Sequence, residues 1–110
     1  MYDFIDVGSS KGGSVLFAQR NFGKNGYGID VDPEKVKLAQ SRGLDVRHQD
    51  IFDITDRAKW VTILHTLEHL PDLEYCKRLI KKATEIGENV YMTFPSFSHD
   101  DYLLEWNLRS

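Results

Sequence analysis

Three aspartates stand at the ends of three short apolar runs, and their type and spacing suggest ligand chemistry. Asp6 lies in FIDV, Asp30 lies in YGIDV, and Asp50 follows VRHQ. If the runs are parallel strands, their carboxyl ends share one edge of a sheet, so the three carboxylates converge on one crevice. Carboxylates accept hydrogen bonds from the vicinal hydroxyls of a ribose and from the exocyclic amino group of an adenine. The pattern therefore predicts a site for an adenosine-containing ligand.

A glycine-rich turn follows the first apolar run directly, in DVGSSKGG. Gly8, Gly12 and Gly13 let the backbone turn tightly into a helix whose first N–H groups face outward, as anion-binding and nucleotide-binding turns do. Asp30 lies 22 residues beyond Gly8, the distance expected of a ribose-binding acid on the second strand. The glycine-rich turn and Asp30 together favour a nucleotide-binding site.

A second candidate for chemistry is HTLEH, residues 65–69, which matches the H-x-x-E-H pattern of zinc peptidases. His65 follows an apolar run and Pro71 comes soon after, which leaves little room for a helix that carries both histidines. No third ligand is evident, so we expect no metal site. Glu68 and His69 are instead expected on a loop at the mouth of the crevice, as the candidate catalytic residues that could take a proton.

Alternating strands and helices must position these residues. Such an order predicts right-handed crossovers and a parallel sheet with both faces covered. Asp32 and Pro33 give the second helix a cap followed by proline at its first position. The expected strands cover residues 4–7, 27–31, 44–48, 60–65 and 90–94; the expected helices cover 14–22, 34–42 and 71–86; 51–59 is expected to be a loop or single turn, and 100–106 a last helical turn or two.

Length and composition limit the classes of protein. At 110 residues with 41% hydrophobic residues, the chain is expected to form one domain, residues 1–110. The single Cys76 cannot form an internal disulfide, which favours a reducing cytoplasm. A net charge of −3 argues against a protein that coats nucleic acid. No segment approaches the roughly 20 apolar residues of a membrane span, so no membrane partner is expected.

Taken in order, the stretches FIDVGSSKGG, GIDVDPEKV, QDI, WVTILHTLEHLPD and VYMTFP resemble the class I S-adenosylmethionine-dependent methyltransferases over nearly the whole chain. LEHL after the fourth strand resembles the small-molecule type of that superfamily. The resemblance implies a Rossmann-like α/β fold, a three-layer sandwich with five parallel strands in the order 3-2-1-4-5. It also implies S-adenosyl-L-methionine as the cofactor and methyl transfer as the reaction.

The resemblance also assigns roles to residues. Asp6 and Gly8 are expected against the methionine part of the cofactor, and Asp30 is expected to hold the ribose hydroxyls. Asp50 with Ile51 is expected to contact the adenine, while His65 and Thr66 line the sulfonium side. The full set of expected cofactor-binding residues is Asp6, Gly8, Ser9, Ser10, Gly12, Asp30, Val31, Asp50, Ile51, His65 and Thr66.

The chain departs from the family pattern in two places. Ser10 occupies a position where the family usually carries glycine. The family's sheet continues through antiparallel strands after the fifth, and these are expected to be lacking here. An open fifth strand invites pairing with another chain. We therefore expect either a homodimer through residues 90–94 and the tail, or a truncated piece of a longer methyltransferase.

Two other functions remain open on the sequence alone. A nicotinamide-dependent oxidoreductase would use the same turn and Asp30, but it does not account for Asp6 or for LEHL. A regulatory domain that binds the cofactor without catalysis would keep the whole crevice. The methyl acceptor is also open: a small molecule is favoured, and protein and RNA remain alternatives.

Overall fold

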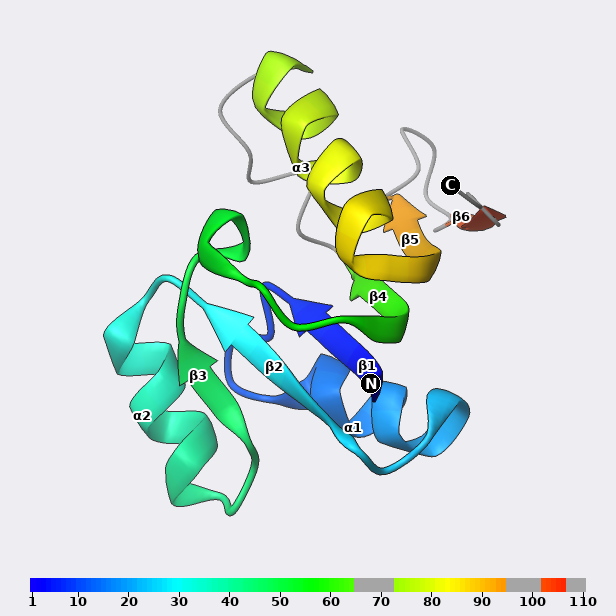
Figure 1. Cartoon of the computed structure of the whole chain (residues 1–110). Helices are drawn as coiled ribbons and strands as arrows, with labels where there is room; N and C mark the ends of the chain where they lie inside the picture. The colour runs from blue at the N-terminus through cyan, green and yellow to red at the C-terminus, as the bar shows by residue number, and fades with distance from the viewer. Residues whose placement is uncertain (65–72, 95–101, 107–110) are drawn as a thin grey trace.

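A computed structural model describes residues 1–64, 73–94 and 102–106 (Figure 1). Its sheet has the strand order β3-β2-β1-β4-β5-β6, and every neighbouring pair from β3 to β5 is parallel. The five parallel strands in the order 3-2-1-4-5 confirm the predicted Rossmann-like fold. The strands are β1 (Tyr2–Val7), β2 (Gly26–Asp30), β3 (Val46–His48), β4 (Ala58–Ile63), β5 (Gly87–Phe94) and β6 (Tyr102–Trp106).

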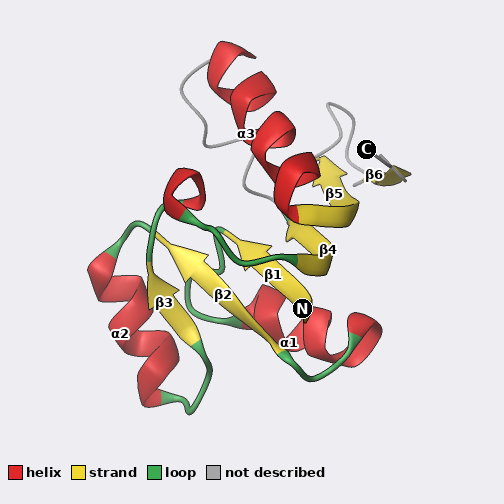
Figure 2. Cartoon of the chain, viewed as in Figure 1, coloured by secondary structure: helices red, strands yellow, loops and turns green. Residues whose placement is uncertain are grey.

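Helices cover both faces of this sheet, as a parallel sheet requires (Figure 2). Phe4 and Ile5 are neighbours on β1, both are fully buried, and they belong to two separate hydrophobic cores. The core around Phe4 includes residues of α1 and α2, whereas the core around Ile5 includes residues of α3. The helices are α1 (Gly13–Phe22), α2 (Pro33–Ser41), the short 3₁₀ helix η1 (Ile51–Asp53) and α3 (Leu73–Ile86).

Local capping explains two of these helix starts. The Asp32 side chain accepts hydrogen bonds from the N–H groups of Glu34 and Lys35, and Pro33 is the first residue of α2, as predicted. The Asp50 side chain caps η1 by accepting from the N–H of Phe52 at 3.0 Å. The single turn expected within 51–59 is therefore η1, although β4 begins earlier than predicted, at Ala58.

The structure corrects the prediction for the end of the chain. Residues 102–106 form no helical turn; they are β6, which pairs antiparallel with β5 from Phe94↔Tyr102 to Val90↔Trp106. The backbone N–H and C=O groups of β5 need partners on this side, and a strand supplies them where an isolated helical turn would not. The expected lack of any strand after the fifth is wrong, and so is the open β5 edge on which the expected dimer depended.

Candidate functional site

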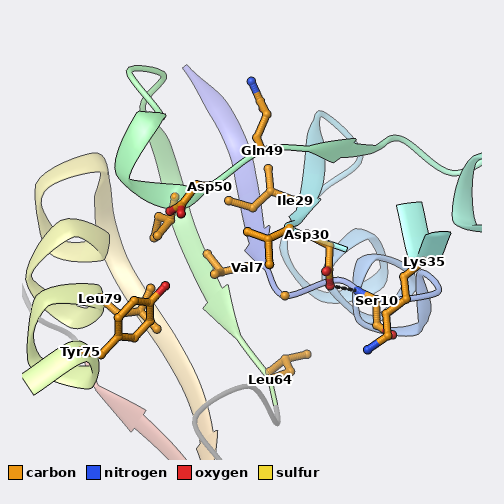
Figure 3. Close-up of a pocket in the computed structure, with 13 residues that line it drawn as sticks. Val7, Ser10, Ile29, Asp30, Lys35, Gln49, Asp50, Leu64, Tyr75 and Leu79 are labelled. Carbon is orange, nitrogen blue, oxygen red and sulfur yellow. Dashed lines mark hydrogen bonds between the residues drawn. The ribbon is translucent and has the colours of Figure 1, made fainter. Parts of the chain in front are cut away.

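A pocket of about 450 Å³ lies where the carboxyl ends of β1 and β2 meet the segments that follow β3 and β4 (Figure 3). Six of the residues predicted to bind the cofactor line it, so the structure brings most of the predicted site together. The lining residues are Val7, Gly8, Ser10, Ile29, Asp30, Val31, Lys35, Gln49, Asp50, Ile51, Leu64, Tyr75 and Leu79.

The turn after β1 is held against the end of β2. Gly8 and Gly12 have φ angles of 73° and 104°, in the left-handed region that favours glycine. Ser10 also lies in this region, with φ of 52°, and its N–H donates to Oδ2 of Asp30 at 2.8 Å. Ser10, the departure from the family pattern, thus keeps the turn conformation that a glycine would adopt, and its hydrogen bond to Asp30 comes from the backbone N–H that a glycine would also have.

Asp30 is oriented by the backbone on both of its oxygens. Oδ2 accepts from the N–H of Ser10, and Oδ1 accepts from the N–H of Asp32 at 2.9 Å. Each carboxylate oxygen can accept more than one hydrogen bond. The carboxylate is therefore fixed at the pocket wall and can still accept from the hydroxyls of a ligand.

Asp6 lies beneath the turn and does not line the pocket. Its carboxylate is fully buried and accepts hydrogen bonds from three hydroxyls, those of Ser9 at 2.6 Å, Thr62 at 2.6 Å and Ser14. These donors come from the turn, from β4 and from α1. Ser9 and Gly12, also predicted to bind the cofactor, are buried and lie outside the pocket lining, so in this structure these residues position the turn.

Burial raises the pKa of the Asp6 carboxyl above its ordinary value of 3.8, against the opposing effect of the three hydroxyl donors, and the charge of Asp30 raises it further. A carboxyl whose pKa is higher in the folded protein than in the unfolded chain makes a pH-dependent contribution to the free energy of unfolding. This contribution is present in full below the unfolded pKa and is lost as the pH rises through the folded pKa. Replacing Asp6 with asparagine removes this titration.

The difference in free energy of unfolding, wild type minus Asp6→Asn, should therefore fall as the pH rises from about 3.9 through the folded pKa, and stay level above it. Urea titrations of both proteins across this range measure the difference. A difference that grows with pH would mean that the three hydroxyl donors outweigh burial.

Gly28 supports the site, although it was not among the residues predicted to be functional. It lies on β2 directly opposite Asp6 in the parallel register, and Thr62 lies opposite Asp6 on β4. A Cβ at Gly28 would overlap the hydroxyl of Ser9 and come within 2.5 Å of Cγ2 of Val15. Only glycine leaves room for the Ser9 hydroxyl to reach Asp6. A glycine inside a buried strand run is the signal that could have identified it.

The wall formed by α3 was also not predicted as part of the site. Leu79 lies on the apolar face of α3 and is 1% exposed. Tyr75, one turn earlier, lines the pocket with it. Figure 3 shows Tyr75 and Asp50 on one side of the pocket and Asp30, Ser10 and Lys35 on the other. The spacing of four residues between Tyr75 and Leu79 was the available signal.

Four predicted residues lie outside the part of the chain that the structure describes, namely His65, Thr66, Glu68 and His69. Among the described residues, no group of three or more histidines, cysteines or acids is arranged to hold a metal ion. Within the same residues, no helix has the length and apolar character needed to cross a membrane.

The fold and the position of the pocket define the class: this is the fold of the class I S-adenosylmethionine-dependent methyltransferases. The chain is similar to the magnesium protoporphyrin IX methyltransferase of Synechocystis PCC 6803, solved with bound S-adenosylmethionine, with a TM-score of 0.74 and 21% identity over 94% of this chain and 53% of that one. It is also similar to an S-adenosylmethionine-dependent methyltransferase from Clostridium acetobutylicum, with a TM-score of 0.69 and 19% identity over 86% of this chain and 43% of that one.

A sequence relative agrees with this class. The ajmaline N-methyltransferase of Rauvolfia serpentina is 28% identical in an alignment of 101 positions that covers 80% of this chain and 34% of that protein. Residues 3–110 match the model of the family described as methionine biosynthesis protein MetW, and the chain belongs to that family. The chain spans about half the length of the solved relatives and about a third of the curated one.

Proposed function

We propose that this chain binds S-adenosyl-L-methionine and transfers its methyl group to a small-molecule acceptor. One observation carries the proposal: Asp30, at the end of β2, and Asp50, at the start of η1, line opposite sides of a single pocket beside the glycine turn. The ribose and the base of an adenosyl group need hydrogen-bond acceptors in this arrangement. Similarity to a methyltransferase solved with S-adenosylmethionine and to a small-molecule N-methyltransferase supports it.

The residues of the pocket fit such a cofactor. Asp30, held by two backbone N–H groups, can accept from the ribose hydroxyls. Asp50 uses Oδ1 for the N–H of Phe52, which leaves Oδ2 for the amino group of the base. Ile51 is almost fully buried and supplies an apolar wall for the flat face of the base. Ser9, Gly12 and Asp6 act here by fixing the shape of the turn.

When bound, the cofactor supplies an electrophilic methyl group on a sulfonium, and the reaction is an in-line displacement. The protein then has to align the acceptor, exclude water and remove a proton where the acceptor carries one. We assign proton removal to His69 or Glu68, and the lining of the sulfonium side to His65 and Thr66. These four residues follow β4 in the chain, and β4 ends at the same sheet edge as the pocket.

The acceptor class and the location belong to the same proposal. The methyl acceptor is proposed to be a small molecule because the sequence relative is named for a small-molecule reaction. A cytoplasmic location is proposed from the use of one cysteine in 110 residues.

Replacing Asp30 with alanine should weaken S-adenosylmethionine binding by about 1.5–3 kcal/mol, because charge-assisted hydrogen bonds to the ribose are lost. Isothermal titration calorimetry measures the change. Asp53→Ala is the matched control, since it removes a carboxylate from η1 that does not line the pocket. Unchanged affinity in a folded Asp30 variant would contradict the assignment.

Titrations of the wild-type protein with S-adenosylmethionine and with NAD distinguish the alternative functions. Wild-type protein that binds NAD and not S-adenosylmethionine would be an oxidoreductase of the nicotinamide type. Protein that binds S-adenosylmethionine tightly but gives no methylated product with any small-molecule, protein or RNA acceptor tried would favour the regulatory, binding-only function.

A further inference from the structure

Ser10 lines the pocket beside Asp30, and its hydroxyl makes no hydrogen bond within the part of the chain that the structure describes. The backbone N–H of the same residue donates to Oδ2 of Asp30 at 2.8 Å, and Figure 3 shows both residues on one side of the pocket. In any staggered rotamer a serine hydroxyl lies within about 4 Å of its own backbone nitrogen. The free hydroxyl of Ser10 is therefore a near neighbour of the Asp30 carboxylate.

The backbone of Ser10 makes a serine costly at this position. Its φ angle of 52° lies in the left-handed region, where a side chain is unfavourable and glycine is not. Non-glycine residues in such conformations concentrate at functional sites, where the side chain has a use that offsets the strain. The Ser10 hydroxyl has no such use within the described residues, so a ligand contact gives a reason for it.

A ribose hydroxyl that donates its hydrogen to Asp30 still carries lone pairs on its oxygen. The ionised carboxylate of Asp30 only accepts, so it cannot satisfy that oxygen. A serine hydroxyl next to the carboxylate can donate to it. Ser10 and Asp30 together therefore offer both a donor and an acceptor to one hydroxyl of a ligand.

Resting on the proposed function, we propose that Ser10 is a specificity-determining residue for the ribose of the cofactor. Its hydroxyl donates to the oxygen of the same ribose hydroxyl whose hydrogen Asp30 accepts. A glycine at this position would still hold Asp30 through the backbone N–H, but it would offer the ribose oxygen no side-chain donor. The serine thus adds recognition at the point where the chain departs from the family pattern.

Two variants of Ser10 test this role by isothermal titration calorimetry with S-adenosylhomocysteine. Ser10→Ala keeps the Cβ and removes only the hydroxyl, whereas Ser10→Gly also relieves the left-handed strain. Both should bind roughly three- to tenfold more weakly than wild type, the loss of one hydrogen bond to the ligand. The urea midpoint of Ser10→Gly should equal or exceed that of wild type, because glycine suits this backbone conformation.

The 2′-deoxy and 3′-deoxy analogues of S-adenosylhomocysteine show whether the lost contact is to the ribose. Ser10→Ala should weaken binding of one analogue and hardly change binding of the other, which lacks the hydroxyl that Ser10 contacts. If Ser10→Ala weakens all three compounds by the same factor, Ser10 does not contact the ribose and the inference is overturned. Full affinity for S-adenosylhomocysteine in Ser10→Gly would also overturn it, because the hydroxyl would then be dispensable.

The matched control is Ser41→Ala, the same chemical change at the last residue of α2, outside the pocket lining. The Ser41 hydroxyl donates to the carbonyl oxygen of Leu38 at 2.6 Å. This variant should bind all three compounds as the wild type does. If wild-type protein binds none of them, the proposed function itself fails, which is a different result from the failure of Ser10 to contact the ribose.

Discussion

Replacing Gly28 with alanine is expected to lower the free energy of unfolding by about 3 kcal/mol. The loss has two causes, because the new methyl group overpacks the interior and because a buried hydrogen bond is broken. The new Cβ would overlap the hydroxyl of Ser9 and press on Val15, which is fully buried and has no room to move. Ser9 would have to turn away from Asp6, and a buried carboxylate would lose one of its three donors. Urea denaturation of the variant measures the loss.

Gly13→Ala is the matched control for this prediction. Gly13 is the first residue of α1, and a Cβ built there meets no atom within 4 Å. Alanine is the better helix former, so this variant should be as stable as the wild type or slightly more so. Equal stability of the Gly28 and Gly13 variants would show that the strand tolerates a side chain opposite Asp6, and the proposed need for glycine would be wrong.

Replacing Asp6 with alanine is expected to destabilise the fold by about 3 kcal/mol or more, because hydroxyls in the interior lose a shared acceptor. Thr62 is fully buried and Ser9 is 1% exposed, so water cannot readily replace the carboxylate for either. Asp30 should be affected as well, since the turn that Asp6 fixes also carries the Ser10 N–H that orients Asp30. The variant should therefore lose both stability and affinity for S-adenosylmethionine.

Denaturant unfolding and calorimetric titration of the same Asp6→Ala preparation test this linkage. Asp56→Ala is a useful comparison, because it also removes a carboxylate that accepts a hydroxyl, that of Tyr27 at 2.6 Å, but at a site away from the pocket lining. The Asp56 variant should be less stable than wild type with its affinity for S-adenosylmethionine unchanged. If the Asp6→Ala variant keeps full affinity for S-adenosylmethionine, the buried hydrogen bonds of Asp6 are not needed for binding and the prediction is wrong.

The features that could be predicted from the sequence are those with local causes. Short apolar runs, glycines at turns and the Asp32–Pro33 cap act within a few residues, and the strands that carry Asp6 and Asp30 were found from them. The convergence of Asp30 and Asp50 followed from the geometry of parallel sheets. The six predicted residues that line the pocket all come from these segments.

The features that were missed depend on partners distant in the sequence. Residues 102–106 form a strand because β5 lies beside them, and no pattern within the segment itself shows this. The burial of Asp6 depends on a hydroxyl from Thr62, 56 positions away. The place of Tyr75 in the pocket depends on how α3 packs against η1 through Phe52.

The central position of β1 has a consequence for how the protein is made. β1 is followed closely along the chain by β2, with which it pairs, but its other neighbour, β4, begins only at Ala58. Until residues 58–63 emerge, one side of β1 has no strand beside it, and Asp6 is still in contact with water. The arrival of β4 supplies Thr62 and closes the interior over the carboxylate. The buried hydrogen bonds beneath the ligand turn can therefore be completed only after Thr62, 56 positions beyond Asp6, has been made.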